Sequence, residues 1–160
     1  MDPDFINSMS EVALSIIVQL SKPQSKQSTR GLHSLLLTLC RNMEDVAPRN
    51  ASVAAQTRAD ELHLGDIRNY HFDHGSRFPG GRKKSELHWE HFIPAVHLKS
   101  QLLSLVNPTS DIIKPILSQS RICWITLQEN SKLNSLGFKS VRPDPQLAYQ
   151  QANITLAYPW

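Results

Sequence analysis

Glu90 and His91 are adjacent, and Pro94 follows three residues after the histidine. Imidazole titrates near neutral pH, so His91 is suited to take a proton from water. A carboxylate such as Glu90 is a hard oxygen ligand for a divalent cation. Neighbouring side chains in a regular strand point to opposite faces, so these two can converge only where a strand ends. Pro94 marks such an end, and the pattern predicts a general base beside a metal ligand.

Asn130 and Asn134 lie four residues apart in a stretch with the pattern of a helix. This spacing places both side chains on one face, about one turn apart. Two such groups can bind one metal ion, and amide oxygens favour Mg²⁺ or Mn²⁺ over Zn²⁺. The spacing therefore predicts that Asn130 and Asn134 can present two ligands to one divalent cation, with Mg²⁺ ahead of Mn²⁺ and with Zn²⁺ the least suited.

Five basic side chains are candidates for contacts with a nucleic-acid backbone: Arg77, Arg82, Lys83, Lys84 and Arg121. Lys and Arg beside a phosphate backbone release counterions and so supply affinity. A solvated run of charge is the alternative interpretation. The formal net charge of +3 is compatible with a polyanion, and DNA is the partner that we expect.

Three further polar residues could serve the same site, namely His88, Asp73 and His74. His88 alternates with Glu90 along the predicted strand, so it faces the metal or the substrate, or it is a structural partner of Glu90. Asp73 and His74 belong to a loop that contacts DNA, orders the entrance of the site, or is a plain surface loop. The stretch from Asn69 to His74 also partly matches the H-x-H-x-D-H metal string of metallo-β-lactamase-type hydrolases, although that fold is usually larger than this chain.

Two strands and one helix must position these side chains. The first strand ends at the acid–histidine pair, and residues 122–125 form a second strand that is rich in apolar residues. Thr126 can cap the helix that follows, and Glu129 at its third position completes a capping box. Gly137 ends that helix.

The rest of the chain is predicted to be mainly helical. Apolar residues at helical spacing, with Ser10 as the cap of the first helix, predict helices over residues 10–20, 30–46, 51–64, 95–106, 111–117 and 147–152. Trp89 and Trp124 fall on the two predicted strands, where we expect them to form core between sheet and helices.

Together these residues resemble the HNH, or ββα-metal, nuclease motif. The first strand of that motif ends in D/E/H-H-x-x-P, which residues 90–94 match. In colicin-type DNases an apolar strand and a Thr precede H-x-x-x-H, and residues 122–134 follow this layout with Asn in both His places. Some HNH enzymes, including CRISPR effector nucleases and intron-encoded nickases, likewise use Asn as the helix ligand.

The resemblance implies a role for each matching residue. His91 would be the general base, and Glu90 and Asn130 would be metal ligands. Asn134 would be an additional or supporting ligand. Colicin-type enzymes also carry a basic phosphate contact seven residues before the base, and Lys84 has that position here. The expected activity is metal-dependent endonucleolytic cleavage of DNA.

The expected fold is α+β, with a small ββα-metal motif (a two-stranded hairpin plus a helix) embedded in a mainly helical single domain. Residues 65–137 of the 160 would form the nuclease core with a helical insertion. Residues 9–64 would form a helical scaffold that could support a homodimer, and residues 138–160 a tail with a short helix. Residues 1–8 resemble a vector-derived leader.

Two alternatives to a DNase remain open at this point. HNH enzymes usually carry an Asn just before the second strand, where this chain has Ser120 and Arg121. That departure motivates a non-catalytic nucleic-acid-binding protein on a degenerate HNH scaffold. An RNA-cleaving toxin or effector would keep the same basic residues and His91.

The two cysteines, Cys40 and Cys123, each sit in an apolar run without a C-x-x-C pairing. We expect buried thiols in a reducing, cytoplasmic compartment. No apolar run approaches 18 residues, so no membrane partner is expected.

Overall fold

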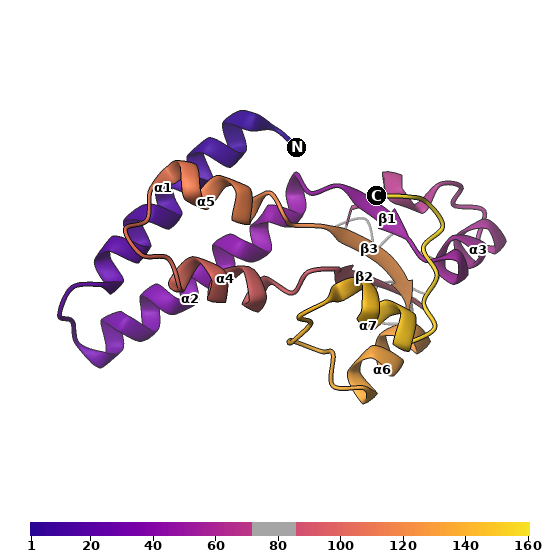
Figure 1. Cartoon of the computed structure of the whole chain (residues 1–160). Coiled ribbons are helices and arrows are strands. Elements are labelled where there is room, and N and C mark those ends of the chain that lie inside the picture. Colours follow the sequence, from indigo (N-terminus) through magenta and orange to yellow (C-terminus); the bar gives the residue numbers. More distant parts are fainter. Residues whose placement is uncertain (72–85) are drawn as a thin grey trace. The chain divides into compact units, whose positions relative to one another are not determined.

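The computed structural model describes residues 1–71 and 86–160, and it confirms a mixed α+β chain that is mainly helical (Figure 1). Where the sequence predicts one domain, the chain divides into two compact units. Each unit is assembled from two separate stretches: Met1–Ala47 with Ile93–Ser120, and Pro48–Phe92 with Arg121–Trp160.

The first unit is a bundle of helices. Its members are α1 (Pro3–Leu20), α2 (Lys26–Asn42), α4 (Ala95–Leu103) and α5 (Ser110–Leu117), with a 3₁₀ turn at Met43–Asp45. Apolar side chains recur at helical spacing on each member and meet in one core, which includes Leu36, Leu98, Leu102, Ile113 and Leu117. Burying one such side chain contributes about 1.5–3 kcal/mol, so this core stabilises the bundle.

The predicted start of the first helix at Ser10 is wrong. The helix starts at Pro3, and the Asp2 side chain caps it by accepting a hydrogen bond from Asp4 N at 2.9 Å. A proline just after a capping acid is a strong start signal, because its ring fixes a helical φ and its missing N–H needs no partner. Ser10 instead lies buried inside α1, where its hydroxyl donates to the Ile6 carbonyl at 2.7 Å.

The second unit contains a three-stranded sheet in the order β1–β3–β2 (Figure 1). The strands are β1 (Arg49–Ala51), β2 (Leu87–His91) and β3 (Ile122–Thr126). β2 and β3 pair antiparallel, whereas β1 pairs parallel with β3. The helices of this unit are α3 (Val53–Glu61), α6 (Leu127–Ser135) and α7 (Pro145–Gln151), with a 3₁₀ turn at Ile67–Asn69.

The strand β1 is absent from the sequence-based prediction, which continues a helix back to Ala51. The helix starts at Val53, because Ser52 caps it by accepting from Ala55 N at 3.0 Å. Ala51 lies in β1, opposite Trp124.

The junction between β3 and α6 matches its prediction. Thr126 accepts from Glu129 N at 3.1 Å and Glu129 accepts from Thr126 N at 2.7 Å, which completes the capping box. Glu129 also accepts from the Ser52 hydroxyl at 2.7 Å, so one carboxylate ties the starts of α3 and α6 together. Gly137 follows the helix with φ of 85°, a left-handed conformation that glycine adopts without strain.

Both cysteines are free and buried, as the sequence predicts. In the described ranges, no helix combines the length and the apolar character that crossing a membrane requires.

Candidate functional site

The side chains of β2 alternate between two faces of the sheet up to its last residue. Glu90 pairs with Cys123 and His91 pairs with Ile122, so both lie inside the regular ladder. A strand that stays in register sends successive side chains to opposite faces. Glu90 and His91 therefore face away from each other, and the convergence expected at the strand end does not occur within β2.

Glu90 is held by two basic side chains on its own face of the sheet. Its Oε2 lies 3.0 Å from His88 Nε2, and its Oε1 accepts a hydrogen bond from Arg142 Nη2. The Glu90 side chain is 12% exposed and that of Arg142 is fully buried. Of the roles that the sequence left open for His88, the structure shows a contact with Glu90 as a structural partner.

Arg142 also fixes the backbone around the end of β2. Its Nε donates to the Phe138 carbonyl at 2.7 Å, and its Nη1 donates to the His91 carbonyl at 2.8 Å. The Arg142 guanidinium therefore links the Glu90 carboxylate and the His91 carbonyl to Phe138, which lies in the segment after α6.

The Glu90 carboxyl stays ionised in this environment. Burial alone would raise its pKa, but the hydrogen bond with His88 and the positive charge of Arg142 outweigh burial, and the pKa lies below the ordinary value of 4.5. A carboxylate with a lowered pKa in the folded state stabilises the fold above its unfolded-state pKa and loses that contribution as the pH falls through the folded-state pKa.

We expect Glu90→Gln to flatten the acid limb of the stability curve. Because glutamine has no proton to take up, the free energy of unfolding of the variant should fall less steeply than that of the wild type below pH ~4.5. Urea titrations at pH 3–7 would measure this difference. Parallel curves for the two proteins below pH ~4.5 would contradict a lowered Glu90 pKa.

The Glu90 carboxylate already has partners among the described residues. Each carboxylate oxygen already has a basic partner. In residues 1–71 and 86–160, no group of three or more His, Cys, Asp or Glu side chains is placed to hold a metal. Asn130 and Asn134 do come together on α6, where Asn134 Nδ2 donates to Asn130 Oδ1 at 3.4 Å.

The opposite face of the sheet carries an aromatic and basic group around Trp89. The Trp89 and Trp124 rings meet edge-on at 5.0 Å, and both residues are buried, as predicted for core. The His71 ring lies 5.2 Å from Trp89, and the Arg49 guanidinium lies 5.6 Å from the centre of a Trp89 ring. His91 shares this face, because it lies two residues after Trp89 in the same strand.

Arg49 is a candidate that the sequence analysis missed. A three-residue strand has too few positions for alternation to be visible, so no local signal placed Arg49 on the sheet. Its position becomes apparent only from the parallel pairing of β1 with β3.

The other predicted contacts divide into two groups. Arg121 is half-buried directly before β3, and its carbonyl accepts from Phe92 N at 2.9 Å. The remaining candidates lie outside the described residues: Asp73, His74, Arg77, Arg82, Lys83 and Lys84.

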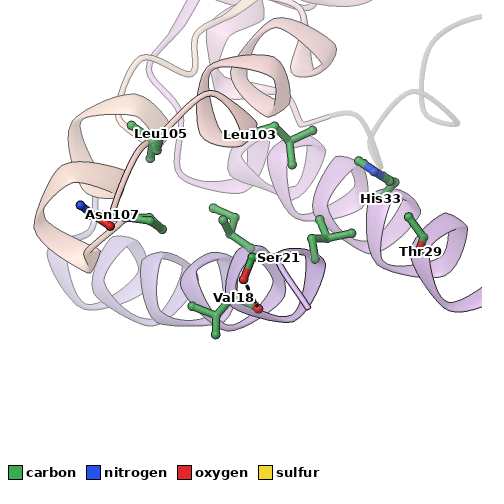
Figure 2. A pocket seen from close by; sticks show the side chains of 10 residues that line it. Val18, Ser21, Thr29, His33, Leu103, Leu105 and Asn107 are labelled. Carbon is green, nitrogen blue, oxygen red and sulfur yellow. Dashed lines mark hydrogen bonds between the residues drawn. The ribbon is translucent and has the colours of Figure 1, made fainter. Parts of the chain in front are cut away.

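A separate pocket of about 560 Å³ lies within the first unit (Figure 2). Its lining is mainly aliphatic, from the end of α1, the start of α2 and the segment after α4. Polar side chains include His33, Thr29 and Ser21, whose hydroxyl donates to the Val18 carbonyl at 2.8 Å. None of the residues predicted for catalysis or metal binding lines this pocket.

Comparison with protein-family models, with curated proteins and with solved structures finds no match for this chain.

Proposed function

We propose that this protein is a ββα-type endonuclease that hydrolyses phosphodiester bonds in DNA, with His91 as the general base. The observation that carries the proposal is the order of elements around His91. β2 ends at His91 and pairs antiparallel with β3, which passes through a capping box directly into α6. α6 packs against both strands, as the HNH resemblance implies.

The proposed chemistry needs a base and positive charge at one place. His91 takes a proton from water, and the resulting hydroxide attacks phosphorus. The bond from phosphorus to the 3′ oxygen breaks, and that oxygen takes a proton from solvent water to leave as a hydroxyl group. Basic side chains neutralise the charge that develops on the phosphate. The hydrogen bond from Arg142 to the His91 carbonyl supports the role of His91 as the base, because it holds the end of the strand that carries this histidine.

Glu90 acts indirectly in this proposal. Its ion pair with the buried Arg142 orients the guanidinium toward the His91 and Phe92 carbonyls. The requirement for Mg²⁺ or Mn²⁺ that the HNH resemblance implies stays a prediction. A ligand role for Glu90 would require that the metal displace Arg142, and no step of the proposed reaction depends on that exchange.

A second candidate is a nucleic-acid-binding protein that keeps the ββα scaffold without catalysis. The specific observation in its favour is that Arg142 and His88 occupy the carboxylate that the HNH resemblance assigns to a metal. A scaffold that has replaced the metal with a guanidinium would keep its fold and lose its cofactor.

A cleavage assay on supercoiled plasmid DNA distinguishes the endonuclease from the non-catalytic nucleic-acid-binding protein. We expect nicked or linear DNA in the presence of Mg²⁺ or Mn²⁺. Cleavage that EDTA abolishes would support the metal that the HNH resemblance implies, whereas cleavage that persists in EDTA would support hydrolysis by His91 without a metal. Early linear product without a nicked intermediate would favour the homodimer that a double-strand cut implies. Intact plasmid with every metal, together with a gel shift of duplex DNA, would reject the DNase and support the binder. Cleavage confined to an RNA substrate would instead identify an RNA-cleaving effector.

A further inference from the structure

We infer that Arg49, His71 and His91 form a phosphate-binding site on the Trp89 face of the sheet, and that Arg49 makes the principal contact with a phosphodiester of the DNA backbone. The inference rests on the proposed function, because it names the group that holds the substrate beside His91. All of these residues belong to the second unit.

The sheet register places Arg49 and His91 in one row. Ile122 of β3 pairs with Arg49 on one side and with His91 on the other. Side chains of directly paired residues point to the same face. With neighbouring strands about 4.8 Å apart, the Cα atoms of Arg49 and His91 lie roughly 10 Å apart across β3. The buried Ile122 side chain lies between them on this face, so a phosphate that contacts both would bind at the ends of the two longer side chains.

The Arg49 guanidinium has no carboxylate partner among the described residues, and its buried Nε has no hydrogen-bond acceptor there. Three other arginines of this unit differ from it, because each pairs with a carboxylate: Arg58 with Glu86 at 2.9 Å, Arg68 with Asp66 at 2.7 Å, and Arg142 with Glu90. A half-buried, unneutralised guanidinium on the face of the candidate base is suited to an external anion. Its planar fork matches two oxygens of one phosphate.

Trp89 orients the two groups that flank it. Arg49 lies over its ring and His71 packs against it, so neither side chain needs to be ordered when an anion arrives. Preorganised donors lose less conformational entropy on binding than mobile ones. The neutral ring cannot replace the anion, because it offers no acceptor to the guanidinium N–H groups.

The test is the salt dependence of binding to a duplex oligonucleotide. Arg49→Gln should weaken binding and should reduce the slope of log Kobs against log[salt] by about one, since one phosphate contact is lost. Arg49→Lys keeps the charge and should keep the slope. Arg30→Gln, an exposed arginine of α2, makes the same change in charge and should leave the slope unchanged. A wild-type slope in a folded Arg49→Gln protein would overturn the inference.

If Arg49→Gln does not fold, the inference can still be tested by a measurement on the wild-type protein. Titration with inorganic phosphate, followed by NMR at the Arg49 Nε–H and the Trp89 indole N–H, should shift both signals. Shifts confined to Trp160 or to other sites would overturn the inference.

The two proposals can fail separately. A reduced salt slope in Arg49→Gln, together with an intact plasmid under every metal, would support the phosphate site and reject the nuclease. If the wild type cleaves DNA in a metal-dependent way and the salt slope of Arg49→Gln is unchanged, the nuclease is supported and the phosphate site is rejected.

Discussion

Replacing Arg142 with methionine is expected to lower the free energy of unfolding by about 3–5 kcal/mol, because it leaves the Glu90 carboxylate buried without its guanidinium. The arginine side chain is fully buried and donates to the Glu90 carboxylate and to the Phe138 and His91 carbonyls. Removing one partner of a buried ion pair costs more than the pair contributes, since the remaining charge has no compensation. His88 stays in contact with Glu90 and offsets part of the loss.

Equilibrium urea unfolding of Arg142→Met against wild type measures this effect. Lys114→Met is the matched control, because Lys114 pairs at 3.0 Å with an Asp111 side chain that is 90% exposed. An exposed pair contributes about 0–1 kcal/mol, so this control should change stability little. The double variant Arg142→Met with Glu90→Leu should recover much of the loss, since it removes the uncompensated charge. A loss in Arg142→Met no larger than in the Lys114 control would show that the buried pair does not hold this part of the fold.

The sequence predicts best where the signal is local. The capping box at Thr126 and Glu129 and the glycine at position 137 each act over a few residues, and the structure has all three in their predicted roles. The strand predicted at residues 122–125 is apolar throughout and is confirmed as part of β3 (Ile122–Thr126). Local chemistry also explains the error at Ser10, because the competing signal at Asp2 and Pro3 is stronger.

Contacts between residues distant in sequence could not be predicted in the same way. Arg142 lies 52 residues after Glu90, and nothing in the spacing of either residue indicates the other. Its pairing with Glu90 gives that residue a structural contact, while the metal-ligand role stays a prediction. Arg49 likewise reaches the row of His91 only through the parallel pairing of β1 with β3. The residue types of the candidate site are therefore visible in the sequence, whereas their division between two faces of the sheet is not.

His91→Ala is expected to reduce plasmid cleavage by about 10²–10⁴-fold, the usual contribution of a positioned general base. Binding to duplex DNA should change much less, because the proposed phosphate contact comes mainly from Arg49. The fold should also persist, since Arg142 contacts the carbonyl of residue 91 and this atom is present in alanine. A loss of cleavage without a loss of binding or of stability is therefore the signature of a base.

His63→Asn is the matched control for this experiment. His63 is an exposed histidine of the same unit with φ of 56°, and asparagine tolerates that left-handed conformation. The control should cleave at the wild-type rate, which would show that the loss in His91→Ala does not follow from replacing just any histidine of this unit. Because Glu90 and His91 face opposite sides of the sheet, Glu90→Gln should affect cleavage mainly through stability and should recover at lower temperature, whereas His91→Ala should not recover. Cleavage that persists in His91→Ala would assign the base to another group, and His71, on the same face, would be the next residue to replace.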